Sequence, residues 1–306
     1  DSILEEDALL RLVRPFLDRP GVTVAAGGHV RIANGCVVAN GRIVDVRLPR
    51  RALPLIQTVE YLRSFLFART GWSAVNGLLI IAGAFGLFER RAVVDAGGYA
   101  ADAVGEDLEL VLRLHHTLRR RGRPYRVTFV SDPVCWTQVP DTVRTLGLQR
   151  NRWQRGLIDA LWRHRGMFGR PRFGVVGMLS MPCLVLFEVL APVVEVSGYA
   201  VVLLAYGLGW LDGGFFLALF TVAILYGVAL SVAAVLLEDV AFRRYPRVAH
   251  LLLLVVVGIV EHFGYRQLTA WWGVRAFWDA WRGDRRWGRM EHRGFASETA
   301  PVVRPS

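Results

Sequence analysis

A run of 70 residues without a single basic side chain most constrains what this chain can fold into. Residues 173–242 contain no Arg, and the whole chain contains no Lys, although it carries 37 basic residues in total. The run consists mainly of Leu, Val, Ala, Gly and Phe. One membrane-spanning helix needs about 20 consecutive apolar residues. The run therefore predicts membrane helices and excludes one uniform water-soluble domain.

The positive charge is concentrated before this run. Residues 1–172 hold 26 Arg and 16 acidic residues, a net charge of +10, whereas residues 173–306 hold 11 Arg and 10 acidic residues, a net charge of +1. With 53% hydrophobic residues, the chain has far too much apolar content for intrinsic disorder. These counts predict a basic, water-facing part followed by a membrane part.

Hydrophobic periodicity in residues 1–172 alternates between the repeat of a helix and that of a strand. It predicts helices over residues 9–17, 55–68, 106–121 and 141–165, and strands over residues 22–26, 29–38, 42–46 and 125–130. The strand over residues 22–26 is expected to end at Gly27-Gly28, and Asn40-Gly41 is expected to form a hairpin turn. Such alternation is typical of a layered α/β domain.

The membrane part is expected to extend over residues 173–270. Residues 173–211 fit two helices broken near Pro192 and Gly198, and residues 215–237 form the clearest single span. Residues 248–260 fit either a fourth span or a re-entrant element. The positive-inside tendency does not decide between three and four spans, and four spans with a cytoplasmic tail are favoured. In residues 271–306, Trp and Arg alternate as in an interfacial stretch.

Three acidic residues, Glu188, Glu195 and Glu261, lie within this apolar sequence. An ionisable side chain at such a place is functional by default. Placement at the lipid headgroup boundary is an equally open interpretation.

Two short motifs carry candidate chemistry. Gly105-Glu106-Asp107 stands at the start of a predicted helix, where acidic side chains also serve as ordinary caps. On the next helix, Gln149, Arg152 and Trp153 share one face. This face offers an amide, a guanidinium that can bind phosphate with two hydrogen bonds, and a flat ring that suits a sugar. A basic helix that touches lipid headgroups is the alternative.

Together with their order before the membrane part, these motifs resemble those of the membrane-integrated family 2 glycosyltransferases. This group includes the cellulose, hyaluronan, chitin and poly-N-acetylglucosamine synthases. Its members have a cytoplasmic GT-A domain with an Asp-x-Asp motif, a Gly/Thr-Glu/Asp-Asp motif and a Gln-x-x-Arg-Trp motif. Here Asp1 is similar to the last Asp of Asp-x-Asp, and Gly105-Glu106-Asp107 and Gln149 to Trp153 match the other two.

The resemblance implies a role for each motif residue. Asp107 is expected to be the catalytic base, and Asp1 is expected to bind a divalent metal, Mg or Mn. Substrate binding is expected from Glu106, Gln149, Arg152 and Trp153, and also from Gly83 and Ala84, which match a small-residue segment beside the acceptor. For Gly83 and Ala84, plain close packing is the alternative.

The resemblance also implies an α/β GT-A-type half-domain in residues 1–172, without its first strands and the first Asp of Asp-x-Asp. These 306 residues alone are therefore expected to be inactive. The implied reaction is inverting transfer of a hexosyl unit from a nucleotide sugar, most simply UDP-linked, to a growing polysaccharide, coupled to translocation. The implied location is the bacterial inner membrane, with the catalytic part cytoplasmic.

Two other functions stay open at this stage. The first is a non-processive transferase that adds one sugar to a lipid carrier. The second is a non-catalytic basic membrane protein that binds anionic lipid, which the charge of residues 1–172 allows. No stacking motif for nucleic acid is visible, and nucleic acid is not expected as a partner. The partners that the resemblance implies are membrane lipid, a nucleotide sugar and a glycan or lipid-linked acceptor.

Overall fold

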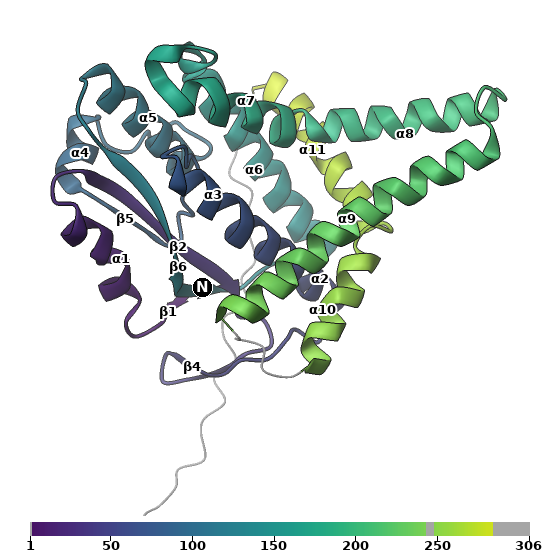
Figure 1. Ribbon diagram of the computed structural model, residues 1–306, viewed down its shortest axis with the longest axis horizontal. Helices are drawn as coiled ribbons and strands as arrows, with labels where there is room; N and C mark the ends of the chain where they lie inside the picture. Colours follow the sequence, from purple (N-terminus) through teal and green to yellow (C-terminus); the bar gives the residue numbers. More distant parts are fainter. Residues whose placement is uncertain (1, 243–247, 284–306) are drawn as a thin grey trace, which may run out of the picture.

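The computed structural model describes residues 2–242 and 248–283, which form an α/β part joined to an arm of long helices (Figure 1). Asp1, the Arg-containing loop 243–247 and residues 284–306 lie outside the described residues. The predictions for Asp1 and for most of the C-terminal Trp-Arg stretch therefore stay predictions.

A mixed four-stranded sheet forms the centre of the α/β part, with the strand order β1-β6-β2-β5. The strands are β1 (Ser2–Leu4), β2 (Thr23–Ile32), β5 (Gly86–Phe88) and β6 (Arg126–Thr137). The two central strands, β2 and β6, are parallel, and the two outer strands pair antiparallel to them. All ten residues of β2 are buried, as expected for a strand covered on both faces.

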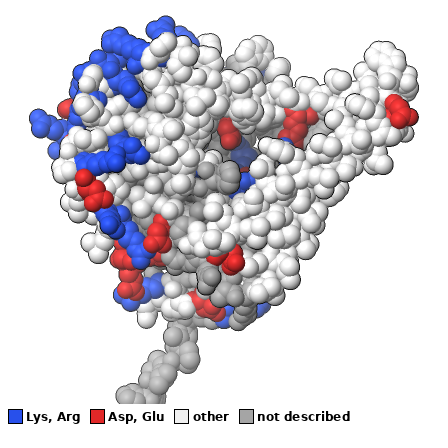
Figure 2. Space-filling view, in the orientation of Figure 1, with Lys and Arg blue, Asp and Glu red and all other residues white. Residues whose placement is uncertain are grey.

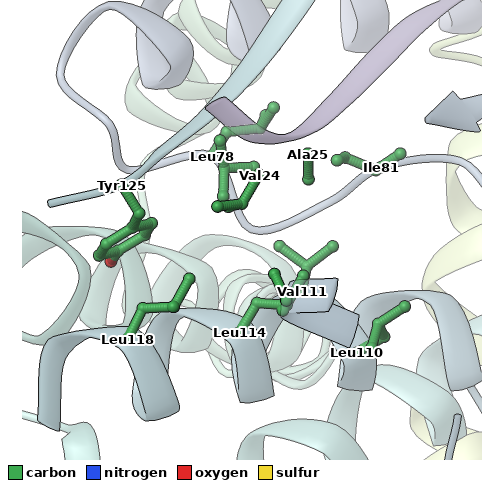
Figure 3. Close-up of a cluster of buried hydrophobic side chains, with 11 residues drawn as sticks. Val24, Ala25, Leu78, Ile81, Leu110, Val111, Leu114, Leu118 and Tyr125 are labelled. Carbon is green, nitrogen blue, oxygen red and sulfur yellow. The ribbon is translucent and has the colours of Figure 1, made fainter. Parts of the chain in front are cut away.

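Helices cover both faces of this sheet. Helix α1 (Ala8–Asp18) packs on one face, and α5 (Glu106–Arg120) packs on the other, where Leu110, Val111 and Leu114 meet Val24 and Ala25 of β2 (Figure 3). The remaining elements of this part are β3 (Val37–Ala39), β4 (Arg42–Asp45), α2 (Ala52–Leu62), η1 (Arg63–Ala68), α3 (Arg69–Ala74), α4 (Arg90–Asp95) and α6 (Val143–Arg163). The predicted α/β class is thus observed as a mixed sheet followed by helices.

Several predicted strand boundaries are wrong. Residues 29–38 do not form one strand, because they contain the end of β2 and the start of β3, and the strand predicted over residues 125–130 continues to Thr137. The chain does not end its strand at Gly27-Gly28, because β2 continues through both glycines to Ile32. These glycines make room for side chains: a Cβ at Gly28 would lie 2.0 Å from the Phe85 ring. The Asn40-Gly41 turn is observed as predicted, since both residues have positive φ and join β3 to β4.

The helical arm begins after two short turns, η2 (Arg165–Met167) and η3 (Pro171–Phe173). Its elements are η4 (Val176–Ser180), α7 (Met181–Leu184), η5 (Val185–Val189), α8 (Ala191–Gly207), α9 (Gly213–Phe242), α10 (Val248–Val260) and α11 (Tyr265–Trp281). In Figure 2 most of the basic side chains on this face lie over the α/β part, whereas the arm formed by α8 and α9 is almost entirely uncharged and shows a few acidic side chains.

One helix in the described part of the chain is long and apolar enough to cross a membrane. It covers Gly213–Ala241, with a mean hydropathy of 2.4, and contains the predicted span 215–237. Two helix pairs also pass this test but are bent, Val176–Val189 with Ala191–Gly207 by 43° and Val248–Val260 with Tyr265–Trp281 by 55°. These residues therefore provide one candidate span, or up to three if each bent pair is one span. The first bend falls at Leu190, beside Pro192, and α8 continues through Gly198.

Ion pairs join the arm to the α/β part. Arg31 of β2 forms an ion pair with Glu238 of α9: its Nη2 donates to Oε2 at 2.7 Å, and its Nη1 lies 2.6 Å from Oε1. The two side chains are 1% and 0% exposed. A second connection is made by Arg63 of η1, which donates hydrogen bonds to Glu261 and to Ser231 of α9; Ser231 also donates to Glu261. Of the acidic residues predicted within the apolar sequence, Glu261 therefore has partners here, and Glu195 accepts a hydrogen bond from Arg266 at 3.0 Å.

We expect Glu238→Gln to destabilise the protein strongly. The substitution leaves the Arg31 guanidinium buried without its counter-charge, which costs roughly 3–5 kcal/mol. Thermal unfolding of the detergent-purified protein measures the effect. The control is Asp18→Asn, which removes the exposed ion pair with Arg14 and is expected to change stability by less than about 0.5 kcal/mol. Equal shifts of Tm in the two variants would contradict this role of the buried pair.

Candidate functional site

The carboxylate of Asp107 is fixed at the start of α5 by two backbone donors. Its Oδ1 accepts a hydrogen bond from the N–H of Leu108 at 2.8 Å, and its Oδ2 accepts one from the N–H of Gly83 at 3.0 Å. The side chain is only partly buried. Asp107 thus has a defined orientation and remains accessible, as a base that takes a proton from a substrate must be.

The small-residue segment predicted from the sequence lies beside this carboxylate. A Cβ at Gly83 would be 3.2 Å from Oδ2 of Asp107, so a larger residue would press on the carboxylate that Gly83 holds. Gly83 and Ala84 are both exposed. The structure therefore brings Gly83 to the Gly105-Glu106-Asp107 motif, from 24 residues earlier in the chain.

A contact between two glycines brings the second motif to the same place. A Cβ at Gly156 of α6 would lie 3.1 Å from both the N and the Cα of Gly105, the residue that caps α5. The two backbones therefore touch at the start of α5. Arg152 precedes Gly156 by one helical turn on α6, so it faces the acidic start of α5.

Arg152 interacts electrostatically with both acidic residues of the first motif. Burial lowers the pKa of Arg152, and the negative charges of Glu106 and Asp107 oppose that shift. A half-buried guanidinium has the chemistry to bind an anion such as a phosphate with two hydrogen bonds.

The other two residues of the second motif differ in exposure. The side-chain carbonyl oxygen of Gln149 is buried and has no hydrogen-bond partner within the described ranges. A buried acceptor without a partner costs free energy, which a bound donor group would recover. Trp153 is 42% exposed, and the guanidinium of Arg150 lies 4.5 Å from its ring centroid.

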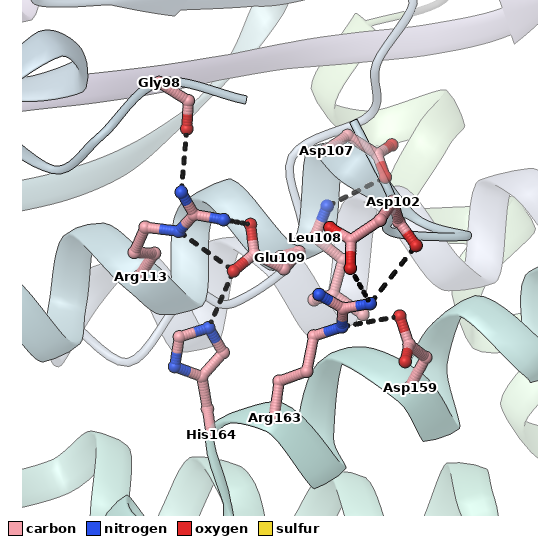
Figure 4. A network of polar contacts seen from close by, with 9 residues as sticks. All are labelled: Gly98, Asp102, Asp107, Leu108, Glu109, Arg113, Asp159, Arg163 and His164. Carbon is pink, nitrogen blue, oxygen red and sulfur yellow. Dashed lines mark hydrogen bonds and ion pairs between the residues drawn. The ribbon is translucent and has the colours of Figure 1, made fainter. Parts of the chain in front are cut away.

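A buried ionic network lies directly behind the motif on α5 (Figure 4). Glu109 is 2% exposed, accepts two hydrogen bonds from Arg113 at 2.6 and 2.9 Å, and contacts Nε2 of His164 at 3.0 Å. Burial acts to raise the pKa of Glu109, but the bonds from His164 and Arg113 outweigh it, so the pKa is lowered. Arg113 also donates to the carbonyl oxygen of Gly98 at 3.2 Å, which ties the Gly97-Gly98-Tyr99 loop to the network.

Two neighbours of Asp107 were not among the predicted site residues. Burial raises the pKa of Tyr99, and the charges of Asp107 and Glu106 raise it further. Burial lowers the pKa of Arg69 to about 10, and three groups oppose this shift: Tyr61 most, then Asp107 and Glu188. The available sequence signals were weak: Tyr99 follows two glycines, and Arg69 directly follows the helix predicted over residues 55–68.

The described residues do not form a metal site by themselves. No group of three or more His, Cys, Asp or Glu side chains that could hold a metal ion occurs within residues 2–242 and 248–283. The proposed metal ligand Asp1 lies outside these residues.

The sequence identifies the class of protein to which this site belongs. Residues 1–278 match the model of the family described as "Glycosyl transferase family group 2", and the chain belongs to this family. This confirms the resemblance drawn from the three motifs.

Similar proteins include bacterial polysaccharide synthases. The chain is 30% identical over 163 residues to the poly-beta-1,6-N-acetyl-D-glucosamine synthase of Staphylococcus aureus (strain COL) and 28% identical over 163 residues to that of Staphylococcus epidermidis. Each alignment covers 53% of this chain and 34% of the relative, so the match spans about a third of the curated proteins. Among solved structures, a mannosyltransferase from Pyrobaculum calidifontis in complex with GDP-Man and Mn²⁺ aligns with a TM-score of 0.46 and 16% identity, over 87% of this chain and 62% of that one.

We expect Gly156→Val to abolish glycosyl transfer. Its side chain would collide with the backbone of Gly105, and α6 would have to move away from α5, carrying Arg152 with it. The matched control is Gly166→Ala, because a Cβ at Gly166 meets no atom within 4 Å. Sugar incorporation in membranes that contain the intact protein measures both variants. Full activity of the Val variant would contradict the importance of this contact.

The Glu109 network predicts a pH-dependent contribution to stability. Because the pKa of Glu109 is lowered, its contribution is fully present above the usual Glu pKa of about 4.3 and is lost as the pH falls through the lowered value. At neutral pH, Glu109→Gln should cost about 2 kcal/mol. Unfolding measured from neutral to acidic pH should show that the difference in the free energy of unfolding between the wild type and this variant becomes smaller below about pH 4.3.

Glu6→Gln is the control for this pH series, since Glu6 forms an exposed ion pair with Arg42. We expect this variant to follow the wild type at every pH. A difference between Glu109→Gln and the wild type that does not change with pH would disprove the assignment to Glu109.

Proposed function

We propose that this chain carries the acceptor side of an inverting hexosyltransferase in a GT-A-type domain, residues 1–172. In this proposal a hexosyl unit passes from a nucleotide sugar, UDP-linked, to a growing polysaccharide. The fixed and accessible carboxylate of Asp107 carries the proposal. It lies where α5 and α6 meet and faces a cationic residue, as a base beside a departing diphosphate must.

Asp107 acts on the acceptor sugar. Its carboxylate takes the proton from an acceptor hydroxyl while the hydroxyl oxygen bonds to the anomeric carbon of the donor. The bond from that carbon to the nucleoside diphosphate breaks on the opposite face, so the anomeric configuration inverts. The diphosphate leaves with the electron pair of this bond. The transition state has oxocarbenium character, as in glycoside hydrolysis.

The second motif binds both the departing diphosphate and the acceptor sugar. The guanidinium of Arg152 neutralises charge that develops on the departing diphosphate. Gln149 accepts a hydrogen bond from an acceptor hydroxyl through its partnerless carbonyl oxygen, or donates one to the diphosphate through its amide nitrogen. The exposed indole of Trp153 stacks on the acceptor sugar. Glu106, Gly83 and Ala84 complete the substrate contacts around Asp107.

A divalent metal, Mg or Mn, belongs to the proposal through the family resemblance alone. When bound, such an ion supplies positive charge to the diphosphate. The described residues do not form a set of ligands for it, so no step is assigned to the ion.

The names of the relatives support polymer synthesis. They are poly-beta-1,6-N-acetyl-D-glucosamine synthases, so UDP-N-acetylglucosamine is the first donor to test, with UDP-glucose beside it. We place the α/β part in the cytoplasm and the arm in the bacterial inner membrane as a multi-pass region in contact with lipid. Sizing the labelled product made by the intact protein separates a long polymer from a single-sugar glycolipid, the other product open to this family.

We expect Asp107→Asn to lower the transfer rate roughly a hundredfold or more, because an amide cannot accept the acceptor proton. Binding of the nucleotide sugar should persist, since Asp107 acts on the acceptor. Asp95→Asn, at an exposed ion pair with Arg121, is the control and should behave as wild type. Near-normal turnover by Asp107→Asn would mean that another group is the base.

A further inference from the structure

Trp153 stands in a set of contacts that the proposed reaction does not explain. The Arg150 guanidinium lies over its indole at 4.5 Å, and the same guanidinium donates to Oε2 of Glu60 at 2.8 Å. The hydroxyl of Tyr265 donates to this same oxygen at 2.7 Å. Arg150 and Tyr265 therefore donate to the same carboxylate oxygen of Glu60, beside the indole. We call these three residues, Glu60, Arg150 and Tyr265, the clamp.

The clamp joins three separate elements. Glu60 is on α2, Arg150 and Trp153 are on α6, and Tyr265 is the first residue of α11. Helix α11 packs closely along α6, since a Cβ at Gly147 would lie 2.9 Å from the ring of Trp272 and Asn151 donates to Asp279 at 2.8 Å. The arm thus contacts the helix that bears the second motif.

The clamp is more buried than the ring that it holds. The side chains of Arg150 and Glu60 are 13% and 23% exposed, and Tyr265 is also buried, whereas Trp153 is 42% exposed. Partial desolvation strengthens both the ion pair and the attraction of the cation to the ring. Arg150 covers one side of the indole, so the exposed area of the ring is what a ligand can reach.

A planar cation at position 150 suits the contacts with both the Trp153 ring and the Glu60 carboxylate. A guanidinium can lie flat on an indole and donate to a carboxylate in its own plane at the same time. A Lys ammonium keeps the charge but offers no plane, so it cannot hold the ring in one orientation.

We propose that Arg150 is a positioning residue, held by Glu60 and Tyr265, that fixes the orientation of the Trp153 indole for the acceptor sugar. This inference rests on the proposed function, in which Trp153 stacks on the acceptor. It adds that the orientation of the ring depends on α2 and α11, outside the helix that carries the ring.

The test uses the intact protein with the donor that supports turnover and a short β-1,6-linked N-acetylglucosamine oligomer as acceptor. Arg150→Lys, Glu60→Gln and Tyr265→Phe should each raise KM for the acceptor, for the Lys variant by roughly three- to tenfold. The KM for the donor and kcat should change little, because Asp107 and Arg152 are untouched. Arg144→Lys, at an exposed Arg on the same helix, is the matched control.

A double-mutant cycle separates positioning from general support of the fold. If Arg150 acts through the ring, Arg150→Lys in a Trp153→Leu background should not raise the acceptor KM further. Full additivity of the two changes, or an unchanged acceptor KM in Arg150→Lys, would overturn the inference.

The same measurements distinguish this inference from the proposed function. An unchanged acceptor KM in Trp153→Leu would overturn the stacking role of Trp153, and the clamp inference with it. A raised acceptor KM in Trp153→Leu together with wild-type behaviour of all three clamp variants would overturn the clamp alone. Absence of transfer by the wild type with either nucleotide sugar would overturn both.

Discussion

The geometry of the candidate site depends on one contact between two backbones. Gly105 caps α5, Gly156 lies in the middle of α6, and no side chain separates them. This close approach places Arg152 one turn away, opposite Glu106 and Asp107. A Cβ added at either position would lie 3.1–3.3 Å from the other backbone, so a larger side chain would press the two helices apart. The two motifs are 42 residues apart between Asp107 and Gln149, and these glycines let them meet.

The arm is joined to the α/β part by desolvated charges. Arg31 and Glu238 form a fully buried pair between β2 and α9, and Arg63 contacts Glu261. Such pairs are costly to form and costly to break, so they favour one relative placement of the two parts over alternatives in which a charge is left unpaired. The clamp at Trp153 adds a third connection, between α2, α6 and α11. The arm with the candidate span and the face with the candidate site are therefore held in one arrangement.

Much of the secondary structure was predictable because hydrophobic periodicity is a local property. The helices α1, α5 and α6 lie close to their predicted ranges, and the run predicted as the clearest single span, residues 215–237, lies within α9. The strand through Gly27 and Gly28 was missed because glycine is typical of turns, whereas here it makes room for Phe85. Tyr99 and Arg69 were missed as neighbours of Asp107 because neither has a spacing that points to the motif.

The sequence by itself determined the family, the residues of the three motifs and the separation of a basic part from an apolar one, since these follow from residue types and their order. Only the tertiary structure decided which atoms meet. It placed the N–H of Gly83 on Asp107, turned Arg152 toward the acidic start of α5, and put Arg150 rather than another residue on the indole of Trp153. The physical reason is that backbone contacts between glycines and pairing of buried charges act across long sequence separations, which periodicity and spacing do not encode.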